Sequence, residues 1–76
     1  MFERILVDPN ICHGKPVIKG TRVLVSVVLG YLANGSSVEQ VIEDYPQISK
    51  EDILAAISFG SFLSNFESYS YDLQAS

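Results

Sequence analysis

The sequence predicts a mostly α-helical domain of three helices in a helix-turn-helix arrangement, preceded by a short N-terminal β-strand and a β-hairpin arm. Three observations carry this prediction. Apolar residues recur at helical spacing in three successive segments. The second and third of these segments begin directly after a serine, a favoured N-cap residue. The connection between them, residues 45–49, is as short as the turn of a helix-turn-helix.

The N-terminal part of the chain is expected to form a strand and a basic hairpin. The segment Arg4-Ile5-Leu6-Val7 is β-branched and apolar, so it is predicted as the strand. Further on, Val17-Ile18 and Thr21-Arg22-Val23 flank Lys19-Gly20. Two short β-prone runs around a two-residue turn that ends in glycine are typical of a tight hairpin, with Lys19 at or near its tip.

The first helix is predicted from about Val25 to Asn34. Gly35 follows it and can adopt the left-handed conformation that commonly ends a helix. Apolar residues at i, i+3, i+4 and i+7 form one stripe, which consists of Val25, Val28, Leu29 and Leu32.

The second helix is predicted from about Val38 to Tyr45, with the same apolar spacing. Ser37 is its expected N-cap, and Gln40, three residues later, completes a capping box. Pro46 ends this helix, because proline cannot continue the hydrogen-bond ladder.

The third helix is predicted over residues 50–63, after the N-cap Ser49. Glu51 and Asp52 complement the positive end of its dipole. Its apolar residues spread widely around the helix, which indicates burial on more than one side. Gly60 costs about 1 kcal/mol relative to alanine inside a helix, so it is expected to mark close packing against another helix.

These elements divide one domain into an N-terminal strand and basic arm (1–24), a helix-turn-helix core (25–63) and an acidic aromatic tail (64–76). The tail is rich in serine and lacks a helical stripe, so it would be disordered if left free. Its aromatic residues are Phe66, Tyr69 and Tyr71. Because aromatic side chains are unusual in a free tail, we expect it to dock on its own domain, on a second copy or on a partner.

Composition bounds the size of the core and the location of the protein. The chain has 76 residues, 47% of them hydrophobic, and a monomer of this size is marginally stable. We therefore expect a homo-oligomer, most simply a dimer, or a protein partner. The sequence has no long apolar run for a membrane helix and no signal peptide, so a cytoplasmic location without membrane association is expected. Cys12 is the only cysteine, so no internal disulfide forms.

Charge is distributed unevenly along the chain. Residues 1–34 carry four Lys or Arg against two Asp or Glu, whereas residues 35–76 carry Lys50 alone against seven Asp or Glu. The balances are +2 and −6. Such asymmetry indicates that the two halves face different surroundings, although a merely solvated acidic surface would give the same count.

Motifs that could support chemistry fail on inspection. Cys12 and His13 are adjacent, so they point to opposite faces of an extended segment, and no second ligand pair completes a zinc site. The stretch from Gly14 to Thr21 does not fit the phosphate-loop pattern, because Gly20 is followed by threonine instead of lysine. We therefore predict no catalytic residue, no metal, no cofactor and no enzymatic activity.

The helix-turn-helix raises the question of DNA binding. In such proteins the second helix enters the major groove with its N-terminal residues, which here are Lys50, Glu51 and Asp52. Because affinity for DNA depends on cations that contact phosphates, two acidic residues fit this role poorly. Cations from the first half would have to serve instead, together with Lys50: Arg4, Lys15, Lys19 and Arg22. A helical pair used only for packing is the alternative.

The residues also carry a family resemblance. The run from His13 to Val23 (HGKPVIKGTRV), followed by Gly35-x-Ser37-x-Glu39-Gln40-x-Ile42 and by Tyr45-Pro46, closely resembles the domain-of-unknown-function 433 family. The resemblance extends from about Arg4 to Phe59 and excludes the tail. Two departures are Leu24 and Val38, where many relatives carry proline. The family pattern falls on Gly14, Lys15, Pro16, Gly20, Thr21, Arg22, Tyr45 and Pro46.

This resemblance implies a helix-turn-helix or winged-helix-like fold in a small bacterial protein. Members of the family often look like antitoxins encoded beside a PIN-like ribonuclease toxin, so it further implies a protein that silences its toxin and binds its own operator DNA. The aromatic residues offered as partner contacts are Phe59, Phe62, Phe66, Tyr69 and Tyr71. Residues 51–76 contain no Lys or Arg, so the tail is not expected to enter a metal-binding nuclease site as a basic plug.

Three functional readings follow. The first is an antitoxin-like protein-binding module that neutralises a PIN-like toxin, with DNA binding as a secondary role. The second is a stand-alone DNA-binding transcriptional regulator. The third is a dimeric interaction domain with neither role.

Overall fold

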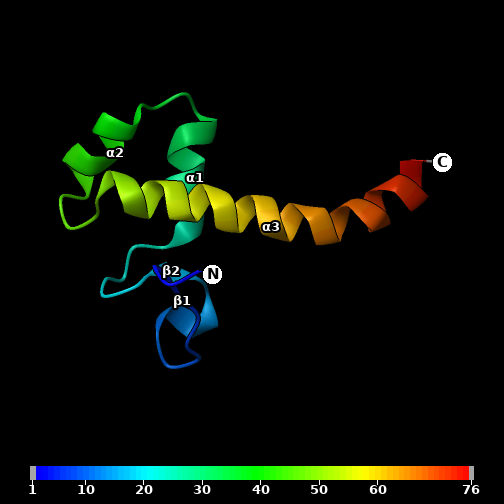
Figure 1. Ribbon diagram of the computed structural model, residues 1–76, viewed down its shortest axis with the longest axis horizontal. Helices are drawn as coiled ribbons and strands as arrows, with labels where there is room; N and C mark the ends of the chain where they lie inside the picture. Colours follow the sequence, from blue (N-terminus) through cyan, green and yellow to red (C-terminus); the bar gives the residue numbers. More distant parts are fainter. Residues whose placement is uncertain (1, 76) are drawn as a thin grey trace.

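The computed structural model describes residues 2–75 of the chain, and the side chains as far as residue 65. Figure 1 shows a mostly helical molecule with a small two-stranded sheet near the N-terminus, so the predicted fold class is confirmed. The elements in order are β1 (Ile5–Leu6), the 3-10 turn η1 (Cys12–Gly14), β2 (Val17–Ile18), α1 (Val25–Ala33), α2 (Val38–Asp44) and α3 (Lys50–Ala75). The predicted aromatic contacts Phe66, Tyr69 and Tyr71 have side chains outside the described residues.

The sheet differs from the predicted hairpin in its pairing. Strand β2 pairs antiparallel with β1, with Ile5 opposite Ile18. The chain does turn back after β2, and Gly20 takes a φ of +84° in that turn. The returning segment 21–23 forms no strand, however, and only the isolated bridge between Val17 and Leu24 continues the ladder.

The side chain of Thr21 explains why the returning segment is irregular. Its hydroxyl donates to the Ile18 carbonyl at 2.8 Å and accepts from the Val23 N–H at 3.0 Å. These local bonds compete with a regular ladder, as threonine side chains commonly do in turns. The Val25 N–H then donates to the Pro16 carbonyl at 3.0 Å, so the first turn of α1 is attached directly to the arm.

The core lies where the sheet meets the three helices. Every helix contributes at least one buried side chain, and the turn between α2 and α3 contributes Ile48. No polar or charged side chain is buried among the residues that the structure describes. The buried apolar residues are Val17, Ile18, Val23, Val25, Val28, Val41, Ile48, Ile53 and Ala56.

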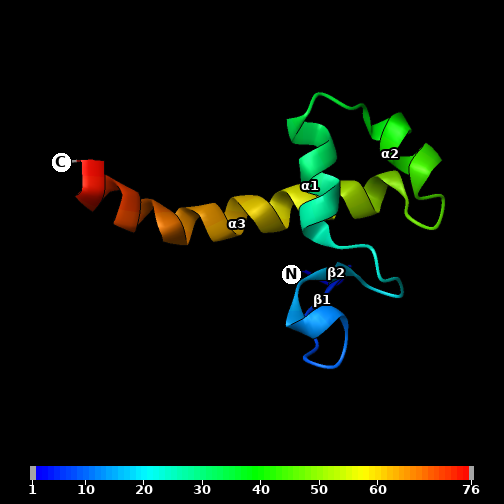
Figure 2. The same ribbon diagram turned by 180° about the vertical axis from the view of Figure 1, so that it is seen from behind.

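Helix α1 ends as the sequence predicts. Gly35 adopts a φ of +90°, its N–H donates to the Leu32 carbonyl, and the Ser36 N–H donates to the Tyr31 carbonyl, each at 3.0 Å. This pair of bonds is a Schellman motif, and it satisfies carbonyls that the helix itself leaves unpaired. Seen from either side, α1 crosses α3 steeply (Figure 2).

Helix α2 is capped by Ser37, but not by a full capping box. The Gln40 N–H donates to Ser37 Oγ at 3.1 Å, as predicted. The Gln40 side chain does not return to the Ser37 backbone, because its Nε2 donates to Asp44 Oδ1 at 3.1 Å instead. This bond to a carboxylate is charge-assisted, and it draws the Gln40 side chain, with the Oε1 that would accept from the Ser37 N–H, away from the start of the helix.

Helix α3 continues well beyond Leu63, where the sequence predicted its end. No proline or glycine follows Gly60, so nothing in the backbone stops the helix. Figure 1 shows the orange and red part of α3 projecting away from the other elements, along the 44 Å long axis of the molecule. Gly60 does mark close packing, since a Cβ there would approach Leu29 Cδ1 of α1 to 2.9 Å.

Candidate protein-interaction surface

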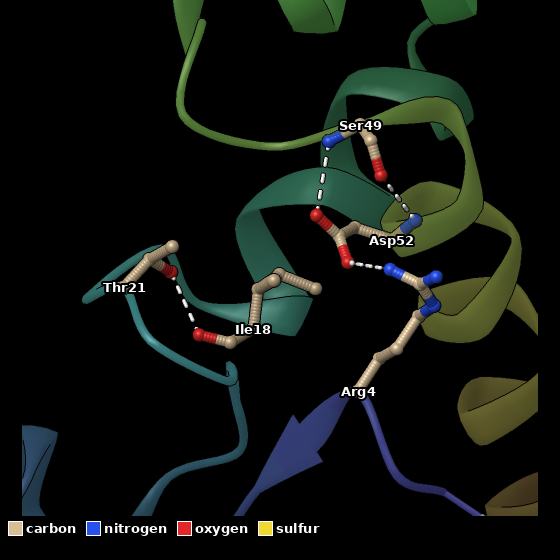
Figure 3. Close-up of polar contacts among 5 residues, drawn as sticks. All are labelled: Arg4, Ile18, Thr21, Ser49 and Asp52. Carbon is tan, nitrogen blue, oxygen red and sulfur yellow. Dashed lines mark hydrogen bonds and ion pairs between the residues drawn. The ribbon is translucent and has the colours of Figure 1, made fainter.

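A polar network joins the start of the chain to the start of α3 (Figure 3). Arg4 Nη1 donates to Asp52 Oδ1 at 3.0 Å, and the Ser49 N–H donates to Asp52 Oδ2 at 2.9 Å. The Asp52 N–H donates in turn to Ser49 Oγ at 3.2 Å. Ser49 and Asp52 therefore form a reciprocal capping box, and Arg4 attaches the N-terminal strand to it.

This network sets the charge state of Asp52. Burial raises the pKa of its carboxyl group, but the hydrogen bonds from Ser49 and Arg4 and the positive charge of Arg4 outweigh burial and lower the pKa below its usual value. Asp52 is therefore ionised at neutral pH. The stability that it contributes is present above the usual aspartate pKa and is lost as the pH falls through the lowered one.

The network also makes Arg4 a poor candidate for contacting DNA phosphates, because the carboxylate of Asp52 offsets its positive charge. At the start of α3, Lys50 is exposed, but exposed Glu51 follows it directly. The tip of the predicted recognition helix therefore presents Lys50 beside a carboxylate, and the structure does not turn this end into a cationic surface.

The other predicted cations lie on the N-terminal arm. Lys15, Lys19 and Arg22 are all exposed, and none forms an ion pair within the described part of the chain. Arg22 borders two shallow hollows, one of about 320 Å³ beside Leu6 and one of about 230 Å³ beside Tyr45. Neither hollow includes Lys15, Lys19 or Lys50, so the arm offers separate surface charges instead of one shaped site.

Of the predicted aromatic contacts, two have described side chains. Phe59 is half-buried and packs against the core, whereas Phe62 is 39% exposed. Both rings lie 5.2 Å from the ring of Phe2, at interplanar angles of 88° and 60°. The sequence did not single out Phe2, because a residue 57 positions before Phe59 gives no local signal of the contact.

A groove opens beside this aromatic cluster, between the start of the chain and α3. Its volume is about 440 Å³. The lining residues are Phe2, Glu3, Arg4, Ala55, Ser58 and Phe62.

The outward face of α3 is unusually apolar. Leu54 is 50% exposed and Ile57 42% exposed, and their spacing of three residues places them on one face of the helix. Leu63 is also 42% exposed. The wide spread of apolar residues around the third helix was the signal in the sequence, but it predicted burial on several sides, whereas the structure leaves these side chains in water.

A second polar pair joins α1 to the end of α2, beside the Tyr-Pro turn. Tyr31 Oη donates to Asp44 Oδ2 at 2.8 Å, and this hydrogen bond, with some burial and the negative charge of Asp44, raises the pKa of Tyr31 to about 12. The ring of Tyr31 also meets that of Tyr45 edge to face at 5.8 Å. Both rings pack against the core, so this pair holds α1, α2 and the turn together.

Residues of the family pattern perform structural tasks. Gly14 and Gly20 take positive φ values of 80° and 84°. Thr21 orders the turn after β2, and the Pro16 carbonyl holds the start of α1. These residues therefore specify turns and the start of a helix, while Gly20, Thr21 and Arg22 also line the hollow of about 320 Å³.

Two further observations concern the described residues alone. Their side chains contain no group of three or more His, Cys, Asp or Glu residues that could hold a metal ion. None of their helices combines the length and the apolarity that crossing a membrane requires.

Comparison with known proteins places the chain among relatives of unknown function. Residues 5–60 match the family described as "Protein of unknown function (DUF433)". Uncharacterized protein y4eO of Sinorhizobium fredii (strain NBRC 101917 / NGR234) is 41% identical over 54 residues, which is 71% of this chain. The match covers 24% of y4eO, so this chain spans about a quarter of that relative.

A solved structure gives the same fold. The crystal structure of a DUF433 member protein from Anabaena variabilis ATCC 29413 is similar to this chain with a TM-score of 0.69 at 25% sequence identity. The similarity covers 93% of this chain and 68% of that chain.

Proposed function

The chain belongs to the DUF433 family, whose function is unknown, and from this premise we propose that it is a non-catalytic protein-binding module with an antitoxin-like role. In this role it contacts a PIN-like ribonuclease in the bacterial cytoplasm and neutralises it. The observation that carries the proposal is the exposed apolar face of α3, with Leu54 and Ile57 each more than 40% exposed. An amphipathic helix that presents apolar residues at i and i+3 is a recurrent way to bind a partner protein.

The length of α3 supports the same reading. Its buried side chains, Ile53 and Ala56, lie near its N-terminal end, and the helix then projects beyond the rest of the molecule. Helical segments without tertiary packing are marginal in water. Residues 61–65 are all exposed. A partner that covers this stretch would stabilise the helix, and burial of its apolar side chains would favour binding.

A binding role also fits the titratable groups with shifted pKa values. Asp52 and Tyr31 are the described examples, and each is committed to a structural partner. Asp52 caps α3 and holds Arg4, while Tyr31 bonds Asp44. Neither is placed to act on a substrate, and this supports a non-catalytic module.

Co-expression tests the proposal. A PIN-like ribonuclease encoded beside the gene should arrest growth when it is expressed alone, and co-expression of this chain should restore growth. The double substitution Leu54→Glu and Ile57→Glu should abolish the rescue, because it places charges on the contact face. Val7→Glu is the matched control, since Val7 is 56% exposed but belongs to the N-terminal segment and not to α3. If no such neighbour exists, or if the α3 variant rescues as well as the wild type, the antitoxin-like role fails.

A second candidate is a DNA-binding regulator, supported by the exposed and unpaired cations Lys15, Lys19 and Arg22 of the described arm. It predicts binding to the chain's own upstream DNA that weakens steeply with salt. Lys19→Glu combined with Arg22→Glu should remove this binding. A chain that binds no DNA even at low salt eliminates the candidate.

A homodimer is the third proposal, and it follows from the apolar composition of a small domain. The α3 face is the surface that a second copy would cover. Sedimentation of the purified chain distinguishes a dimer from a monomer that awaits a different partner.

A further inference from the structure

The groove between the start of the chain and α3 has an apolar lining, which contacts between aromatic rings hold in place. Ala55 and Phe62 of α3 and Phe2 on the opposite side supply its apolar lining. Phe2 is held in place by ring contacts to Phe59 and Phe62. A volume of about 440 Å³ lies within the range of sites that accept a ligand or a side chain of a partner.

The charges around this groove are mainly negative. Arg4 lines it, but the ion pair with Asp52 offsets its charge. Glu3 also lines it and has no ion pair among the described residues. Glu51 stands four positions before Ala55, on the same helix stripe, and residues 51–76 contain no Lys or Arg. The groove therefore combines an apolar lining with one carboxylate that has no ion pair among the described residues, Glu3, and a second carboxylate, Glu51, lies one helical turn before the lining residue Ala55.

A second copy of the chain is a poor occupant for such a groove. Its α3 would bring the same carboxylates against these, with only Lys50 to offset them, and like charges across an interface are unfavourable. Its basic arm would have to dock head to tail. Such a heterologous contact forms a ring or an open chain of molecules instead of closing as a two-fold dimer.

We propose that this groove binds a basic apolar segment of a partner protein, which packs an aromatic or aliphatic side chain against Phe2, Ala55 and Phe62 and places a neighbouring Lys or Arg beside Glu3 and Glu51. This inference rests on the proposed protein-binding function and specifies the chemistry of the partner. The two carboxylates provide charge complementarity at the rim, and the aromatic rings provide an apolar pocket and faces that attract a cation.

A displayed library of random short peptides tests the proposal without any toxin. The full chain should recover peptides that carry Lys or Arg next to an aromatic or aliphatic residue. A synthesised winner should bind roughly tenfold more weakly to the Ser58→Arg variant, because the new side chain fills the groove and repels the cation. Ser58 is exposed on a helix, and the melting temperature of the variant checks that it folds.

Two further variants complete the design. Ser26→Arg is the matched control, since Ser26 is an exposed serine on α1 that does not line the groove, and it should leave the affinity unchanged. In the double variant Glu3→Lys and Glu51→Lys, the library should no longer yield basic peptides.

Several outcomes would overturn the inference. They are recovery of no peptide, recovery of acidic peptides, and winners that bind Ser58→Arg as tightly as the wild type. Self-association that Ser58→Arg abolishes would also overturn it, because the occupant would then be a second copy. Growth rescue is scored separately. If rescue fails while basic peptides bind, the antitoxin-like role falls, and if rescue depends on α3 while no basic peptide binds, the inference about the groove falls.

Discussion

The phenol of Tyr31 is a group whose ionisation should lower stability at alkaline pH. The hydrogen bond to Asp44 raises its pKa from 10.0 to about 12, so the folded chain holds this proton more tightly than the unfolded chain does. The resulting stabilisation is complete below pH 10 and is lost as the pH rises toward 12. Urea unfolding at a series of alkaline pH values should show this decline in the wild type and a smaller one in Tyr31→Phe.

A direct titration separates this effect from general alkaline unfolding. The absorbance of tyrosinate should show one phenol with a pKa of about 12, and Asp44→Asn should move that pKa back toward 10.0. The substitution keeps the size of the side chain but removes the negative charge near the phenol. An unchanged titration in Asp44→Asn would mean that Asp44 does not hold the proton of Tyr31.

The backbone of His13 is the second residue with a testable consequence. Cys12, His13 and Gly14 take φ values of 51°, 59° and 80°, so three successive residues are left-handed. Because a β-branched side chain is strained in this conformation, His13→Val should lower the free energy of unfolding by about 1–2 kcal/mol. Lys15→Val is the control, since Lys15 is exposed and already extended, with φ −74° and ψ 143°. Equal effects of the two substitutions in urea would contradict the left-handed assignment.

Some conformations and contacts of single residues can be predicted from the sequence, and others cannot. Gly35 was predictable as the end of α1, because glycine in that place is a local signal. The left-handed Cys12 and His13 were not, because residues other than glycine rarely adopt that conformation, even histidine, which does so more often than most. The ion pair of Arg4 with Asp52 joins residues 48 positions apart, and no local pattern announces it.

At the scale of elements, the crossing of α1 and α3 depends on Gly60. An added methyl group would gain about 1 kcal/mol of helix propensity but would approach Leu29 Cδ1 to 2.9 Å. Because Leu29 must shift to make room, Gly60→Ala should be nearly neutral in the wild type. In a Leu29→Ala background the same substitution should stabilise the chain by about 1 kcal/mol, so a double-mutant cycle should show coupling.

Ser61→Ala provides the reference for helix propensity alone, since Ser61 is exposed on the same helix. It should add a few tenths of a kcal/mol, roughly 0.5 at most, in both backgrounds. If Gly60→Ala also stabilised both backgrounds equally, the close contact with Leu29 would be ruled out.

Helix starts and ends show how far element boundaries follow from sequence. Ser37 and Ser49 were correctly identified as N-caps, because an N-cap bond involves only neighbouring residues. The reciprocal capping box was expected at Ser37 and Gln40 but lies at Ser49 and Asp52, because the Gln40 side chain bonds Asp44 instead of returning to Ser37. The end of α3 was placed too early because the prediction relied on an apolar stripe, whereas helix propensity and the absence of breakers continue the helix.

At the scale of the whole molecule, the candidate surface was the hardest part to predict. The sequence identified an excess of apolar residues and a positive and a negative half. It could not show that Leu54 and Ile57 stay exposed, or that Phe2 and Glu3 fold against α3 to form a groove. Exposure and grooves depend on contacts between segments far apart in the chain, so they appear only once the fold is assembled.

The fold should require only the first part of α3. Every buried side chain of the described residues lies between Val17 and Ala56, and the family match ends at residue 60. Deletion of residues 66–76 should therefore change the melting temperature by less than about 4 °C, which corresponds to less than about 1 kcal/mol in a domain of this size. Deletion from residue 57 onward is the contrasting variant, because it removes Phe59 and the contact of Gly60 with α1.

This longer deletion should leave the chain largely unfolded, since a small domain has little stability to lose. Thermal melting followed by circular dichroism compares the two chains directly. A fall of more than about 8 °C on removing residues 66–76 would show that the projecting part of α3 belongs to the folding unit. The chain that lacks residues 66–76 keeps both the α3 face and the groove, because both lie before residue 66. If this chain melts like the full chain, it is a minimal domain on which binding can be measured. Binding that survives the short deletion would then place the contact on Leu54, Ile57 and the groove, and not on the aromatic tail.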